Sequence, residues 1–145
     1  MLMQWCSSSI KNTIVSNDGL IRYVKSIRRM IAGTDNLSSQ QCSNLSANEC
    51  ALEQEDIIRL GRELTPPWQL NEDEKSISHT YSFKNYYQTM AFVNVIAQIA
   101  HLQDHHPDLL VSYNRCTVTY STHSVDGLSI KDFICAAKIN LAQDL

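Results

Sequence analysis

The stretch ISHTYSFKNYYQTMAFVNVIAQIAHLQDHHP, residues 77–107, decides the fold because its hydrophobic pattern changes period once. Ile77, His79, Tyr81 and Phe83 alternate with other residues in the period of two that is typical of a strand. From residue 84 the apolar side chains recur at three- and four-residue steps, which predicts an amphipathic helix. The predicted core face of this helix is Tyr86, Met90, Val93, Ala97 and Ala100.

Shorter segments on both sides complete the pattern. Helices are predicted over residues 52–64 and 128–142, and strands over 68–70, 109–113 and 115–122. Strand pairs joined by short turns form antiparallel sheets, and helices of this length cover one face of such a sheet. We therefore predict an α+β fold, a four-stranded antiparallel sheet with helices packed on one face, in the order helix, two strands, helix, two strands, helix.

The composition is that of an ordinary globular domain. The chain has 145 residues, of which 43% are hydrophobic and 19% are charged, with a net charge of -3. A net negative charge argues against nucleic-acid binding through phosphate contacts, and no apolar run reaches the length of a membrane span. The five cysteines are an odd number without C-x-x-C spacing, which disfavours a disulfide framework and a zinc knuckle and favours reduced thiols in the cytoplasm.

The N-terminal part differs from the rest. Residues 1–34 carry five basic residues and one acidic residue, a net charge of +4. Six apolar residues between positions 20 and 31 recur at helical steps, which predicts a basic amphipathic helix followed by a polar linker. We assign residues 1–44 to an N-terminal extension and 45–145 to the main domain. An acid-poor, Arg-bearing start is also typical of an organelle transit peptide, so the alternative to an appended helix is a targeting segment.

Four of the five histidines fall within 23 residues, at positions 101, 105, 106 and 123. Histidine exchanges protons near neutral pH, and Pro107 disfavours helical geometry at His106, so the pair should lie where the long helix ends. This arrangement suits general acid-base chemistry. His101 and His105 also have an i, i+4 spacing that can bind zinc or another transition metal.

Two sequence blocks carry a family resemblance. The first is His101, three residues, and then His105-His106-Pro107; the second is Thr122-His123 followed by Gly127-Leu128-Ser129 and Asp132. With these blocks, residues from about 50 to 145 resemble the pterin-4a-carbinolamine dehydratases. Further matches are Phe83-Lys84-Asn85 at the start of the long helix, FICAAKIN at 133–140, and Trp68 in the first strand. Asp126 stands where the family usually has a small residue.

The resemblance implies a function. Such an enzyme dehydrates 4a-hydroxytetrahydrobiopterin to quinonoid 6,7-dihydropterin in tetrahydrobiopterin recycling, as a homodimer or homotetramer without cofactor or metal. By resemblance, His105, His106 and His123 transfer protons and Asp132 orients an imidazole, while the spacing leaves open which histidine is the acid. The implied substrate contacts are Asp104, His105, His106, Pro107, Ser121, Thr122, His123, Ser124 and Trp68.

An alternative of another class is a non-catalytic protein-binding factor of the same fold, such as a dimerisation cofactor or a complex-assembly factor. A pure binding module has no need to keep all three histidines together. Their joint presence favours the enzyme.

Overall fold

The computed structural model describes residues 36–42 and 50–143. The amphipathic helix and transit peptide predicted within residues 1–34 lie outside these ranges. Asn36–Leu145 form one compact unit, so residues 36–42, which the sequence assigned to the extension, group with the main domain.

The elements follow the predicted order. They are η1 (Leu37–Ser39), α2 (Gln54–Glu63), β1 (Gln69–Leu70), β2 (Ile77–Ser82), α3 (Tyr86–Gln103), β3 (Asp108–Val111), β4 (Arg115–Tyr120), η3 (His123–Val125) and α4 (Ile130–Gln143). No helix within the described residues is long and apolar enough to cross a membrane.

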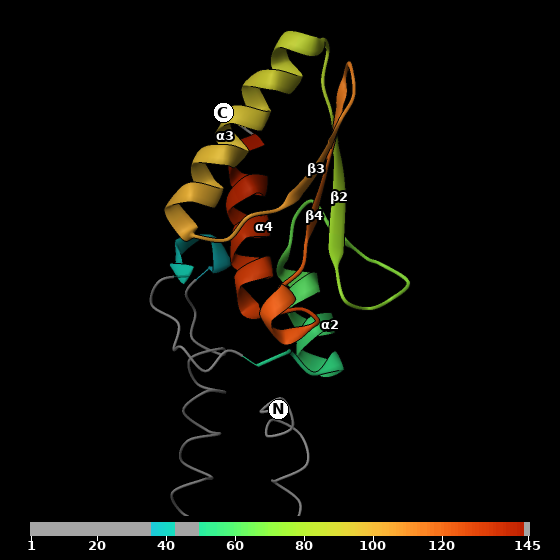
Figure 1. Ribbon diagram of the computed structural model, residues 1–145, viewed down its shortest axis with the longest axis vertical. Coiled ribbons are helices and arrows are strands. Elements are labelled where there is room, and N and C mark those ends of the chain that lie inside the picture. The colour runs from blue at the N-terminus through green and yellow to red at the C-terminus, as the bar shows by residue number, and fades with distance from the viewer. Residues whose placement is uncertain (1–35, 43–49, 144–145) are drawn as a thin grey trace, which may run out of the picture. The chain divides into compact units, whose positions relative to one another are not determined.

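The four strands form one antiparallel sheet in the order β1-β2-β4-β3, which confirms the α+β prediction. The central pair β2 and β4 is matched from Ile77 opposite Tyr120 to Ser82 opposite Arg115. Figure 1 shows α3 and α4 together on one side of the sheet. On the other face, the hydroxyls of Thr80 in β2 and Thr117 in β4 share a hydrogen bond of 2.8 Å.

The core lies between the sheet and α3 and α4. Because strand side chains alternate between faces, Cys116, Val118 and Tyr120 of β4 all point inward and are fully buried. A buried carboxylate, that of Asp132 on α4, lies among these apolar residues.

The predicted core face of α3 is right in part. Ala100 is buried and Val93 packs on the core, but Tyr86 is 52% exposed and stacks on Tyr113 at the surface, and Ala97 is also exposed. The other buried residues of the helix lie on a neighbouring face that the prediction did not include: Thr89, Phe92, Ile96 and Gln103. Apolar side chains occur on both faces of this helix, so periodicity alone did not place the centre of the buried face.

Asn140 joins α4 to the start of the sheet. Its side-chain oxygen accepts hydrogen bonds from the Trp68 indole (3.0 Å) and the Tyr81 hydroxyl (2.6 Å), and its amide donates to the Pro66 carbonyl (2.9 Å). Burial raises the pKa of Tyr81, which keeps the hydroxyl protonated as a donor. One amide therefore satisfies three polar groups in the core.

The free cysteines among the described residues are Cys42, Cys116 and Cys135. All three thiols are buried. Cys50 is disulfide-bonded, so the prediction of reduced cysteines is wrong at that position. A count and spacing of cysteines do not reveal which pairs the fold brings together.

Replacing Asn140 with Ala should lower the free energy of unfolding by about 2–5 kcal/mol, because it leaves two buried donors without an acceptor. Urea unfolding followed by circular dichroism measures this change. Leu141→Ala, at a 63% exposed position on the same helix, is the control and should change it by less than about 0.5 kcal/mol. Equal effects of the two substitutions would contradict the proposed role of the amide.

Candidate functional site

The centre of the candidate site is the carboxylate of Asp132, which has no solvent exposure. Its Oδ1 lies 2.7 Å from Nε2 of His105. Its Oδ2 accepts from the Thr122 hydroxyl at 2.8 Å and from the Ser129 backbone N–H at 2.7 Å. A buried charge needs such compensation, and here three donors from three segments supply it.

Asp132 takes this position because it also begins α4. Ser129 precedes the first helical residue, Ile130, and its hydroxyl accepts from the Lys131 N–H at 3.3 Å, while Asp132 reaches back to the Ser129 N–H. This reciprocal pattern is a capping box, with aspartate in place of the usual glutamate. The positive end of the helix dipole adds to the stabilisation of the carboxylate.

The end of α3 aims His105 at that carboxylate. Asp104 has left-handed backbone angles (φ 50°, ψ 42°), the His105 N–H donates to the Ala100 carbonyl, and the Asp104 N–H donates to the His101 carbonyl. These bonds form a Schellman motif, which stops the helix and turns the chain sharply. The helix thus ends before the two histidines, as Pro107 predicted.

The His105 ring is held on two sides. Its side chain is 11% exposed, and it stacks on Tyr120 with ring centroids 5.3 Å apart and planes 12° apart. Since a carboxylate only accepts hydrogen bonds, Nε2 carries the proton in the contact with Asp132. In the neutral ring the other nitrogen, Nδ1, is then a proton acceptor.

His123 lies on the loop between β4 and α4, and backbone contacts between Thr122 and Gly127 close this loop. The Thr122 N–H donates to the Gly127 carbonyl at 2.8 Å, and these two residues form an isolated β-bridge. The one-turn helix η3 lies between them and carries the exposed His123. Thr122 therefore both anchors this loop and donates to Asp132, which links the His123 segment to the His105 segment.

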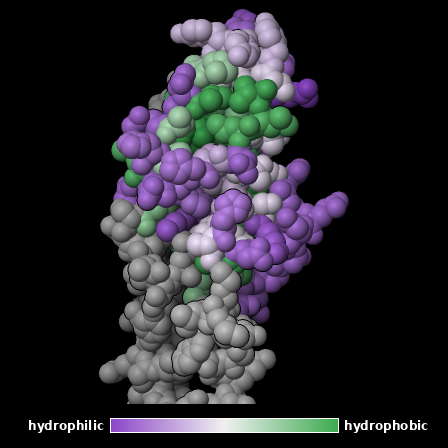
Figure 2. Space-filling view, in the orientation of Figure 1, coloured by the Kyte–Doolittle hydropathy of each residue, from purple (hydrophilic) through white to green (hydrophobic). Residues whose placement is uncertain are grey.

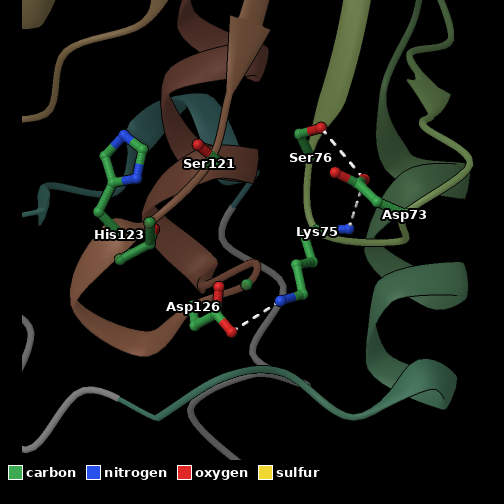
Figure 3. A pocket seen from close by; sticks show the side chains of 8 residues that line it. Asp73, Lys75, Ser76, Ser121, His123 and Asp126 are labelled. Carbon is green, nitrogen blue, oxygen red and sulfur yellow. Dashed lines mark hydrogen bonds and ion pairs between the residues drawn. The ribbon is translucent and has the colours of Figure 1, made fainter.

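A cavity of about 190 Å³ lies beside this loop, lined by Ser121, Thr122, His123 and Asp126 on one side and by the turn before β2 on the other. Lys75 of that turn reaches Asp126 at 2.6 Å (Figure 3). Asp126 has a left-handed φ of 50° immediately before Gly127. Its side chain lines the cavity.

The other predicted residues lie at different depths. His106, Ser124 and Asp104 are exposed, and Pro107 and Ser121 are half-buried. Trp68 lies in the core at 8% exposure, where its indole N–H is bonded to Asn140. The cavity lining includes His123 but neither His105 nor His106. No cluster of three or more His, Cys, Asp or Glu side chains suited to a metal occurs within residues 36–42 and 50–143.

Two contributions were missed from the sequence. The spacing Ser129-x-x-Asp132 signals the capping box that fixes the carboxylate. Tyr120 was read only as part of a strand, and its stacking on His105 needs the register of β4 against the end of α3. Only the first of these had a local sequence signal.

Replacing Asp132 with Asn should lower the free energy of unfolding by about 1–3 kcal/mol, because an amide cannot accept from all three donors. Chemical unfolding measures this loss. Asp126→Asn, an exposed carboxyl on the adjacent loop, should change stability by less than about 1 kcal/mol. An unchanged stability in Asp132→Asn would show that the buried carboxylate is not held as described.

Comparison with known proteins identifies the fold and its relatives. The family model described as pterin 4 alpha carbinolamine dehydratase matches residues 50–142. A protein of Legionella pneumophila strain Corby, named a pterin-4-alpha-carbinolamine dehydratase on a provisional basis, is 49% identical over 107 residues, covering 74% of this chain and 95% of the relative. A Nitrosospira multiformis protein with the same name is 52% identical over 106 residues, covering 73% and 91%.

A solved structure agrees with these sequence matches. The transcriptional coactivator/pterin dehydratase from Brucella melitensis aligns with a TM-score of 0.60 and 31% identity, covering 63% of this chain and 96% of that one. The similarity therefore covers nearly the whole of that relative.

Proposed function

Since the chain belongs to the pterin 4 alpha carbinolamine dehydratase family, we propose that it dehydrates 4a-hydroxytetrahydrobiopterin to quinonoid 6,7-dihydropterin. The observation that carries this proposal is the buried contact of 2.7 Å between Asp132 and His105, one of the two histidines in the His-His-Pro block. This pair supports proton transfer without metal or cofactor, and it lies next to the segment that carries His123.

The reaction needs one proton delivered and one removed. The 4a-hydroxyl leaves as water after it is protonated, and the N–H at ring position N5 loses its proton as the C=N bond forms. Well-placed acid and base groups each contribute about 10²–10⁴-fold to such a rate. The required groups are therefore a proton donor at the hydroxyl and a proton acceptor at N5.

We assign the acceptor role to His105. Its Nε2–H is engaged by Asp132, which leaves Nδ1 to take the N5 proton. The Asp132 carboxylate stabilises the imidazolium that forms, as a carboxylate does behind a catalytic histidine. His123, exposed at the cavity, is then the donor to the hydroxyl, and His106 beside His105 helps to bind the pterin.

The polar walls of the cavity suit the hydrogen-bonding edge of a pterin. Ser121 offers a hydroxyl beside His123, while Thr122 lines the cavity with its own hydroxyl engaged by Asp132. Asp104, Pro107 and Ser124 remain candidate contacts by resemblance. Trp68 shapes the site from the core through its tilted contact with Tyr120, 6.0 Å between ring centroids.

The test is a stopped-flow ultraviolet assay of 4a-hydroxytetrahydrobiopterin dehydration with purified protein. We expect acceleration that a chelator does not affect and that falls about 10²–10⁴-fold in His105→Ala and in His123→Ala. His79→Gln is the control, since His79 contacts the Pro67 carbonyl and does not line the cavity. Circular dichroism checks that each variant is folded.

The result also separates the two classes of function. A folded wild-type protein without any acceleration would contradict the dehydratase and favour a protein-binding factor. Acceleration that survives in both histidine variants would refute the roles assigned to His105 and His123.

We also propose that the chain forms a homodimer or homotetramer. β3 is an edge strand of the sheet and exposes Leu110 (70%) and Val111. Tyr113, after this strand, and Val95 and Leu102 of α3 are exposed as well. Figure 2 shows apolar surface on the upper part of the face seen in Figure 1. Edge strands and exposed apolar residues of this kind are usual places for subunit contacts.

Light scattering coupled to size-exclusion chromatography should give a mass of two or four times the 16.5 kDa chain. Leu110→Lys should shift this mass toward the monomer, because it places a charge in the predicted contact. Leu141→Lys, at a similarly exposed leucine of α4, should leave the mass unchanged. A monomeric wild-type protein would refute the proposal.

A further inference from the structure

A pair of buried thiols lies behind the candidate site. The Sγ atoms of Cys42 and Cys135 are 3.8 Å apart, although the two residues are 93 positions apart in the sequence. Cys135 is on α4, three residues after Asp132, and Cys42 ends the segment that follows η1. A disulfide bond is about 2.05 Å long, so the sulfurs need to approach by less than about 2 Å to form one.

Polar contacts hold the Cys42 segment against the two long helices. The Cys42 N–H donates to the Gln103 side chain at 3.0 Å, and the Gln103 amide donates to the Gln41 side chain at 2.7 Å. The Lys138 ammonium of α4 donates to the Ser38 carbonyl at 2.9 Å. The two sulfurs therefore face each other in a fixed arrangement.

The two thiols have different surroundings. The hydrogen bond from Cys135, together with the positive charges of Lys131 and Lys138, lowers the pKa of Cys42 against the effect of burial. The same hydrogen bond and burial raise the pKa of Cys135. Cys42 is thus the better nucleophile of the pair, and Cys135, 3.8 Å away, is the thiol within reach of a group formed on it.

A third group touches this pair. The buried Tyr120 hydroxyl makes no hydrogen bond of good geometry within the described residues, and the Cys135 thiol is close enough to alter its pKa. The ring of Tyr120 stacks on His105.

We propose that Cys42 and Cys135 form a thiol pair that hydrogen peroxide oxidises to a disulfide, which ties residues 36–42 covalently to α4. The Cys42 thiolate attacks a peroxide oxygen and breaks the O–O bond, which gives a sulfenic acid and, after protonation, one water. The Cys135 sulfur then attacks the Cys42 sulfur and displaces the second water. The two sulfurs lose two electrons in total, and one peroxide is reduced to two waters that hold both thiol protons.

Peptide mapping of the full chain tests the proposal. The protein is reduced, freed of reductant, treated with hydrogen peroxide, alkylated and digested with trypsin without reduction. The sequence places Cys42 in peptide 30–59, Cys135 in DFICAAK (132–138) and Cys116 in peptide 116–131. We expect a cross-link between 30–59 and 132–138.

Variants assign this cross-link to one pair of sulfurs. It should persist in Cys50→Ser, which removes the other cysteine of peptide 30–59, and in Cys116→Ser, which removes a buried thiol elsewhere in the core. It should disappear in Cys42→Ser. Alkylation of both thiols after peroxide treatment, oxidation that stops at a sulfinic acid, or a cross-link that joins Cys42 or Cys135 to a different cysteine would overturn the proposal.

A second measurement does not depend on the variants. Closing a loop of this length should raise the midpoint of thermal unfolding by at least about 4 °C, and reductant should reverse the rise. A midpoint that stays unchanged or falls in the cross-linked protein would contradict the tie between residues 36–42 and α4. Neither readout uses the dehydratase assay, so the proposed function and this proposal can fail separately.

Discussion

The buried carboxylate of Asp132 is the constraint on which the rest of the site depends. It accepts hydrogen bonds from a histidine, a threonine hydroxyl and a backbone N–H, and these groups belong to the end of α3, the end of β4 and the start of α4. A charge without solvent exposure is costly unless it is paired and hydrogen-bonded, and these three donors supply that compensation. The same contacts that orient His105 therefore also fix the junction of two helices with the sheet. Asp132 therefore contributes both to the stability of the fold and to the orientation of His105.

Much of this arrangement could be predicted from local sequence, because its determinants are local. The change of period between residues 77–83 and 84–106 indicated the strand and the long helix, and Pro107 indicated where that helix ends. The sheet and the helix order were confirmed. The chosen face of α3 was right only in part, since the helix has apolar residues on two faces and only the packing decides between them. The contact between Tyr120 and His105 and the approach of Cys42 to Cys135 join distant segments, and no spacing rule within the sequence encodes them.

Residues 36–42 show how a segment of linker-like composition becomes part of a domain. This stretch is rich in Ser, Asn and Gln, yet Leu37 and Cys42 are buried in the core. Side chains of α3 and α4 hydrogen-bond to its backbone: Gln103 accepts from the Cys42 N–H, and Lys138 donates to the Ser38 carbonyl. The polar composition of this segment agrees with its exposed residues, but it does not reveal that Leu37 and Cys42 are buried. As a result, a boundary drawn from polarity alone at residue 44 falls after a segment that packs on the helices.

The turns that frame the site have an unusual chemistry. Among the described residues, three non-glycine residues have positive φ, and all are acidic: Glu74, Asp104 and Asp126. Glycine is the residue that adopts this backbone region without steric cost. An aspartate or glutamate accepts some local strain, but it samples fewer conformations than glycine before folding, so the turn loses less chain entropy when it forms. Of the three, Asp126 lines the cavity, and it places there a negative charge that glycine would not supply.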